Sequence, residues 1–206
     1  MFDTPTATLP RNGRFTPENL PIAGGPPVSA ASTYAEPDLQ RLWSLFSAPA
    51  DLPAAEPVDG SDVPEPYHRL LVHNHHMTVT LEQHHGGPVT LHVLAQRIAG
   101  DSYARKLTLS VGPDRRVVMF GIMRIDLTCV GDAVRREILS GATPLGRILI
   151  EHNVLRRVQF HQCLRFTGNG KLGRHVPLPT YGRLATIFCD GRPAIELLEI
   201  VAGETP

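Results

Sequence analysis

The chain has 206 residues, with 20 basic and 20 acidic side chains and no net charge at neutral pH. This balance does not favour a nucleic-acid partner or an anionic membrane surface. No stretch approaches the roughly 18 apolar residues of a membrane-spanning helix, and the first residues lack the basic start and apolar run of a secretory signal. The length suits one domain with a real hydrophobic core.

Three cysteines, Cys129, Cys163 and Cys189, lie far apart and leave one over in any disulfide pairing. Their spacing is neither a disulfide framework nor a CxxC metal site. We therefore expect reduced thiols and a cytoplasmic protein.

Proline separates the chain into two parts, since twelve of the nineteen prolines fall within residues 1–66. Such a segment buries too little apolar surface to offset the entropy lost on ordering. We predict a proline-rich N-terminal extension over residues 1–62 and a folded domain over residues 63–206. Apolar residues at helical spacing predict one short helix in the extension, within residues 38–46.

Strand patterns dominate from about Tyr67 onward. Alternating or apolar runs predict strands over residues 89–96, 104–111, 116–127 and 157–166, and a final hairpin of residues 182–189 and 193–201. The turn Asp190-Gly191-Arg192 is a strong hairpin signal. Helical patterns cover residues 132–139 and 143–152. Strands joined by short turns and interrupted once by helices indicate an α+β domain with an antiparallel sheet.

Two arginines lie on apolar strand faces. Arg105 alternates with Leu107 and Leu109, and Arg97 continues the face of Val93. A buried guanidinium costs several kcal/mol unless it is paired and hydrogen-bonded. Three alternatives are open for each arginine. It pairs with a protein carboxylate, or its head reaches water at the end of the strand. The third alternative is a ligand carboxylate held by the bidentate guanidinium.

The last strand carries two carboxylates, Glu196 and Glu199, in an otherwise apolar run. Three residues apart on a strand, they point to opposite faces, so at most one faces a given cavity. A carboxylate in an apolar pocket can serve as a general acid or base. The alternative is an edge-strand salt bridge, and alternation does not decide between the two residues.

Seven of the ten histidines fall between His68 and His92, including the run His73-Asn74-His75-His76. His73 and His75 would share a strand face, and imidazoles suit zinc or iron. The sequence has no HExxH motif and no partner cysteines, so we predict no metal site. Histidines at the surface and at the rim of a pocket explain the cluster, and one of them as a hydrogen-bond donor to an anionic ligand remains open.

Residues 67–201 resemble the chorismate pyruvate-lyase family, including its divergent 4-hydroxybenzoate synthetase branch. The resemblance depends on four pieces in the family's order. The first, Leu70-Leu71 followed by Met77-Thr78 and Glu82-Gln83, is similar to the family's helix-end and first-strand motif. The others are Arg97 and Arg105; Thr143-Pro144-Leu145-Gly146-Arg147; and Gly191-Arg192-Pro193 followed by Glu199.

The resemblance implies an antiparallel sheet flanked by helices, with the ligand enclosed under helical flaps. It also implies an enzyme that splits chorismate into 4-hydroxybenzoate and pyruvate without a cofactor. Arg105 would clamp a substrate carboxylate, Arg97 would help to bind it, and Glu199 would handle the proton. The backbones of Met77 and Leu145 would line the pocket.

The segment His73–Thr78 departs from the family, which leaves two alternatives open. One is a related enzyme that acts on a modified chorismate or gives another aromatic acid. The other is a ligand-sensing domain of the same fold, although residues 1–66 are too rich in proline to supply a helix-turn-helix. The expected partner is a small-molecule substrate, and the protein is expected to be a monomer or a small homo-oligomer.

Overall fold

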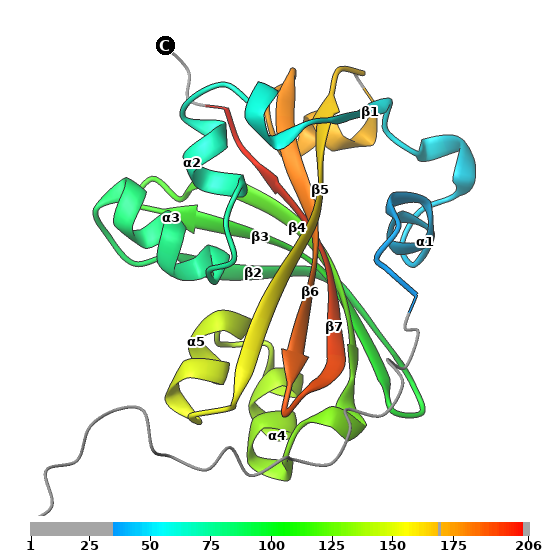
Figure 1. The fold of residues 1–206 in the computed structure, drawn as a ribbon, viewed down its shortest axis with the longest axis vertical. Helices are drawn as coiled ribbons and strands as arrows, with labels where there is room; N and C mark the ends of the chain where they lie inside the picture. Colours follow the sequence, from blue (N-terminus) through cyan, green and yellow to red (C-terminus); the bar gives the residue numbers. More distant parts are fainter. Residues whose placement is uncertain (1–34, 169, 204–206) are drawn as a thin grey trace, which may run out of the picture. The chain divides into compact units, whose positions relative to one another are not determined.

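The sheet in the computed structural model has seven strands in the order β1-β5-β6-β7-β4-β3-β2, and every neighbouring pair is antiparallel (Figure 1). The structure describes residues 35–168 and 170–203. Residues 1–34 of the predicted proline-rich extension lie outside the described residues. The strands are β1 Ala55–Val58, β2 Thr90–Ala99, β3 Ser102–Val111, β4 Arg116–Asp126, β5 Arg156–Phe166, β6 Thr180–Cys189 and β7 Arg192–Val201. The predicted α+β class with an antiparallel sheet is confirmed.

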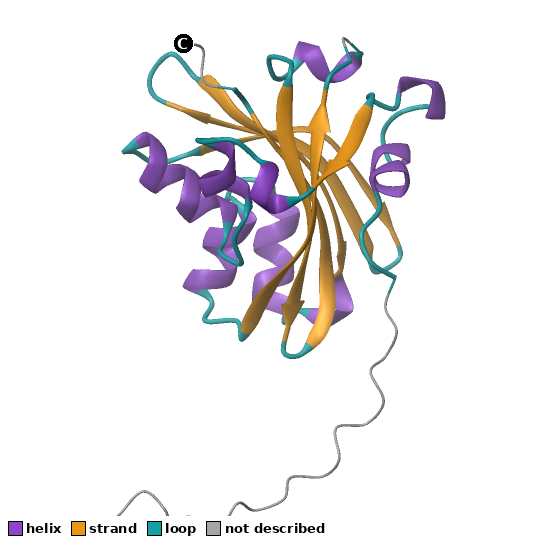
Figure 2. Ribbon diagram, turned by 45° about the horizontal axis from the view of Figure 1, so that its top comes forward, coloured by secondary structure: helices purple, strands orange, loops and turns teal. Residues whose placement is uncertain are grey.

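Helices cover both faces of the twisted sheet (Figure 2). They are α1 Leu39–Ser44, α2 Tyr67–Leu71, α3 Met77–His85, α4 Asp132–Ser140 and α5 Leu145–Glu151. One apolar core joins the sheet to α2, α3, α4 and α5. A second core on the opposite face places Leu42 and Trp43 of α1 against Phe120 and its neighbours. Helix α1 and strand β1 both precede residue 63, so part of the proline-rich region belongs to the folded unit.

The segment around Met77 is a helix, which corrects its assignment to a strand motif. Met77 and Leu81, four residues apart, are both buried on one face of α3, and Gly86 ends the helix at a φ of 69°. His73 and His75 precede this helix in the connection from α2, so they do not share a strand face. The helix has few apolar residues, so the sequence pattern alone did not identify it as a helix.

The β6–β7 hairpin fixes the position of the last carboxylates. Asp190 and Gly191 both have positive φ, at 50° and 77°, which is the conformation of a tight type I′ turn. The resulting register sets Glu199 directly opposite Arg183 on β6 and Gly121 on β4. Because Gly121 has no side chain, Met119 and Leu107 pack closely over it, and a Cβ atom there would lie 3.2 Å from Cε of Met119.

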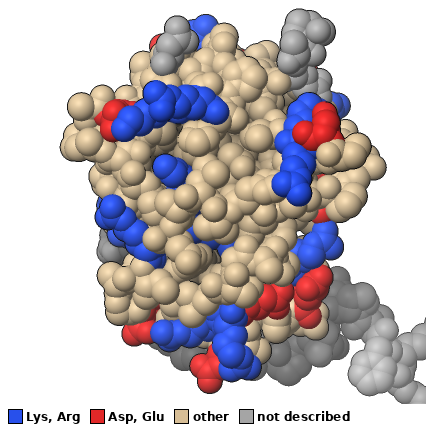
Figure 3. All heavy atoms as spheres, turned by 180° about the vertical axis from the view of Figure 1, so that it is seen from behind, with Lys and Arg blue, Asp and Glu red and all other residues tan. Residues whose placement is uncertain are grey.

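Among the described residues, no helix is both long enough and apolar enough to cross a membrane. Basic and acidic side chains are both scattered over the face of the molecule in Figure 3, and neither sign covers it. The described surface on this side therefore has no continuous patch of one charge.

Candidate functional site

A cavity of about 40 Å³ lies between the sheet and the N-terminal ends of α3 and α5. Most of its wall is apolar, and its polar and flap residues include Arg105, Arg183, Glu199, His76, Met77 and Leu145. This volume has room for a few water molecules. A ring-sized ligand is larger than this cavity, so the residues around it must shift to admit one. The cavity is covered by α3, α5 and the connection at residues 72–76, which together are called the cover.

Arg105 projects from β3 into this cavity and is fully buried. None of its three side-chain nitrogens is in strict hydrogen-bond geometry with a described residue, although the Tyr103 hydroxyl lies close enough to interact with the guanidinium. Burial lowers the pKa of Arg105, and the neighbouring Tyr103 hydroxyl opposes that shift. Arginine stays protonated in proteins even so. The cavity therefore contains a buried cation with no carboxylate partner among the described residues, and an anionic ligand group would satisfy it.

Glu199 lines the same cavity from β7, and only 11% of its side chain is exposed. Its Oε2 accepts a hydrogen bond of 2.7 Å from Nε of Arg183 on β6. Its Oε1 has no hydrogen-bond partner in the described part of the chain. One carboxylate oxygen is thus held by the protein, and the other is available to a ligand.

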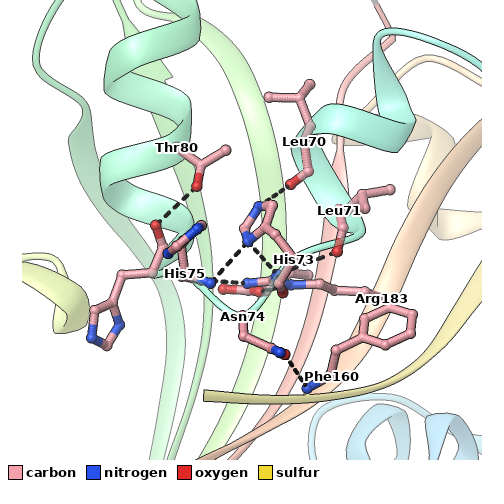
Figure 4. A network of polar contacts seen from close by, with 10 residues as sticks. Leu70, Leu71, His73, Asn74, His75, Thr80, Phe160 and Arg183 are labelled. Atoms are coloured by element: carbon pink, nitrogen blue, oxygen red, sulfur yellow. Dashed lines mark hydrogen bonds and ion pairs between the residues drawn. The ribbon is translucent and has the colours of Figure 1, made fainter. Parts of the chain in front are cut away.

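Arg183 also binds the connection between α2 and α3, as Figure 4 shows. Its Nη1 donates to the carbonyl oxygens of Leu71, at 3.3 Å, and His73, at 2.9 Å. Its Nη2 donates to the carbonyl of His75 at 3.3 Å. A single buried guanidinium therefore contacts both Glu199 and the cover of the cavity.

Sequence reasoning missed Arg183, although the signal was present. On β6 it alternates with Tyr181, Ala185 and Ile187, an apolar strand face of the kind that singled out Arg105. The registers of β6 with β7 then bring Arg183 to Glu199. The partner of this arginine is a protein carboxylate, whereas no carboxylate of residues 35–168 or 170–203 pairs with Arg105.

Met77 and Leu145, the two predicted backbone contacts, lie at the first positions of α3 and α5 and both line the cavity. The two helices are tied together by an ion pair between Arg147 and Glu82. They also approach closely at Gly146, where a Cβ atom would lie 3.0 Å from Oγ1 of Thr78. The Gly and Arg of the motif at residues 143–147 thus join the two parts of the cover.

Replacing Gly146 with Ala should loosen this cover. The added methyl would lie 3.0 Å from Thr78 Oγ1 and 3.2 Å from Cβ of His76, and overpacking of this kind costs about 1–3 kcal/mol. We expect a lower free energy of unfolding in denaturant titrations. Gly87→Ala is the matched control, because a Cβ there meets nothing within 4 Å. Equal stability of the two variants would contradict the tight contact between the helices.

Arg97 does not line this cavity, and its exposure corrects the prediction that it lies on the core face of its strand. It is exposed on β2, with Cζ 5.8 Å from the centre of the Phe46 ring. The strand has a bulge between Val93 and Ala95, after which Arg97 pairs with Ala104 while Gln96 pairs with Arg105. The extra residue reverses the alternation, so the two arginines lie on opposite faces.

Glu196 faces away from the cavity, as expected for a residue three positions from Glu199. Nη2 of Arg124 donates to its Oε1 at 2.8 Å, and Nη2 of Arg41 donates at 3.3 Å. Glu196 thus forms a partly buried ion-pair cluster beside α1, on the opposite face from Arg105.

Two histidines of the predicted cluster have strongly perturbed acidity. Burial, and then the charge of Arg183, lowers the pKa of His73 to about 4. Burial, and then Arg156, lowers the pKa of His76 to about 4, and Nε of Arg156 donates to its Nε2 at 2.7 Å. In the described part of the chain, no three His, Cys, Asp or Glu residues are grouped so that they could hold a metal ion.

These shifts predict that acid destabilises the fold. Both rings stay neutral in the folded state down to pH about 4, whereas an unfolded histidine takes up a proton near pH 6.5. Stability should fall as the pH drops from about 6.5 to about 4, by about 1 kcal/mol for each ring after allowance for solvent screening. In thermal unfolding measured across this pH range, the melting temperature of the double variant His73→Asn/His76→Gln should depend less on pH than that of the wild type. The control His68→Asn, outside the cavity, should keep the pH dependence of the wild type. An unchanged pH dependence in the double variant would contradict the role of His73 and His76 in acid destabilisation.

No protein-family model matches the chain, and no curated protein matches it. The functional interpretation therefore depends on the chemistry of the cavity itself.

Proposed function

We propose that the site binds an aromatic carboxylate, and that the protein is a lyase that converts chorismate into 4-hydroxybenzoate and pyruvate. The observation that carries the proposal is the Arg105 guanidinium, fully buried without a carboxylate partner among the described residues, in a mainly apolar cavity that also contains Glu199. A buried cation surrounded by apolar groups suits a planar acid, whose carboxylate pairs with the arginine while its ring contacts the walls.

The reaction requires little beyond these groups. The ether bond between the ring and the enolpyruvyl group breaks, and the ring carbon that bears the hydroxyl loses its proton. The ring becomes aromatic, and the departing enolpyruvate takes up a proton to give pyruvate. Aromatisation supplies the driving force, so the protein has to orient the substrate and move a proton. In this proposal Arg105 holds the ring carboxylate, and the free oxygen of Glu199 handles the proton without a cofactor.

The fold is proposed to be of the chorismate lyase type, with α3 and α5 as its two flaps. Support comes from the first turns of both helices in the cavity wall and from the ion pair and close contact that join them. A closed cover excludes water, which strengthens the pairing of a ligand carboxylate with Arg105.

The second candidate is a related enzyme that acts on a modified chorismate or forms another aromatic acid. The observation that favours it is the presence of His75 and His76 in the cavity wall, because imidazoles there offer hydrogen bonds to a substituent that plain chorismate lacks.

The test is incubation of the purified protein with chorismate, without added metal or cofactor, and separation of the products by chromatography. Equal amounts of 4-hydroxybenzoate and pyruvate are expected. A different aromatic product would replace the lyase by the second candidate. Unchanged chorismate, together with tight binding of an aromatic acid, would reject the chorismate lyase and leave an enzyme for a modified chorismate or a ligand-sensing domain.

A further inference from the structure

Arg183 connects two parts of the site that have separate tasks. Its Nε binds Oε2 of Glu199 at 2.7 Å, and its Nη atoms donate to backbone carbonyls of Leu71, His73 and His75. Only 1% of the Arg183 side chain is exposed. Each end of the guanidinium is thus fully used, on the carboxylate at one end and on the cover at the other.

His73 completes this arrangement through a fixed tautomer. Its Nδ1 accepts hydrogen bonds from the backbone N–H of His75 and from Nη1 of Arg183, both at 3.1 Å. Its Nε2 lies 2.8 Å from the carbonyl oxygen of Leu70, to which it must therefore donate. The ring is neutral with its proton on Nε2. Its Nδ1 can therefore accept a hydrogen bond from the guanidinium, which a protonated ring would repel.

The segment that Arg183 holds, residues 73–76, forms part of the cavity wall. His75 and His76 line the cavity, and the segment is anchored on its other side by Oδ1 of Asn74, which accepts from the backbone N–H of Phe160 at 3.1 Å. The Arg183 contacts link this segment to the carboxylate by hydrogen bonds, and the charge of Glu199 also acts directly on His76.

We propose that Arg183 is a positioning residue that couples the charge of Glu199 to closure of the segment 73–76. By binding Oε2 it leaves Oε1 directed to the ligand, and by binding the carbonyls it holds the cover down. Its role in catalysis rests on the lyase proposal, whereas the coupling between Glu199 and the cover does not. Loss of the negative charge on Glu199 weakens the hold on Arg183, so the cover opens more often.

Hydrogen exchange tests the coupling in the absence of substrate. Glu199→Gln should speed exchange of the amides of residues 72–76 about tenfold, because the hydrogen bond from Arg183 loses the strengthening effect of the carboxylate charge. In an Arg183→Met background the same substitution should add little, because the link is already broken. Glu196→Gln, whose carboxylate pairs with Arg124 on the opposite face, is the control and should leave these amides unchanged. Unaltered exchange in Glu199→Gln, or fully additive effects of Glu199→Gln and Arg183→Met, would overturn the coupling.

Kinetics test the positioning role separately. Arg183→Lys keeps a buried cation but loses the fork that holds both partners. We expect kcat for chorismate to fall about 10- to 100-fold with KM within about threefold of the wild type, as for a misplaced catalytic group. Arg124→Lys should change neither constant. A rise in KM at unchanged kcat would overturn positioning. If the wild-type protein forms no product, the lyase proposal fails, and the exchange experiment still decides the coupling.

Discussion

Arg105→Met is expected to remove binding of aromatic carboxylates and, at the same time, to stabilise the unliganded protein. The guanidinium is fully buried with no carboxylate partner in the described residues, so the folded protein bears a desolvation cost that a ligand carboxylate relieves. Loss of the pair should weaken binding by about 2–5 kcal/mol, or about 30-fold to several thousand-fold. A methionine of similar length should raise the free energy of unfolding by about 1–3 kcal/mol. Calorimetric titration with 4-hydroxybenzoate and denaturant unfolding measure the two effects.

The opposite signs of these effects separate a ligand-binding arginine from a structural one. Arg97→Met is the matched control from the neighbouring strand, since Arg97 is exposed and lies outside the cavity. It should leave binding unchanged. An Arg105→Met protein that is less stable than the wild type and still binds the acid would show that Arg105 supports the fold and not the ligand.

The contrast between these two arginines also shows how far a strand pattern can be trusted. The alternation rule placed both on the core face, and it was right for Arg105. It was wrong for Arg97 because the bulge between Val93 and Ala95 inserts a residue that no apolar pattern reveals. A bulge is decided by pairing with the next strand, and a single sequence contains no record of that pairing.

Local signals predicted the frame of the site better than its covering. The Asp190-Gly191 turn predicted the last hairpin, and the turn sets the register that places Glu199 opposite Arg183. The helix at residues 77–85 was read as part of a strand motif, because it has few apolar residues and depends on packing against α5. The contacts of Arg183 with residues more than 100 positions away follow only from the assembled fold.

Glu199→Gln is expected to lower kcat for chorismate by about 10²- to 10⁴-fold, the usual contribution of a positioned acid or base, while the Kd of 4-hydroxybenzoate changes little. Glutamine keeps the size of the side chain and an oxygen that can accept from Arg183. It cannot take up a proton at neutral pH. Steady-state kinetics and calorimetric titration of the same preparation give both quantities.

Glu196 supplies the matched control for this experiment, because it lies on the same strand and points away from the cavity to Arg124. Glu196→Gln should keep full turnover, with at most a small loss of stability from the broken ion pair. If Glu199→Gln stays fully active, the carboxylate is a structural partner of Arg183 and aromatisation proceeds through orientation alone. If Arg105→Met also loses binding, Arg105 would be the one charged residue of the cavity that the reaction requires. The apolar residues that line the cavity would then determine which product forms, because they orient the substrate.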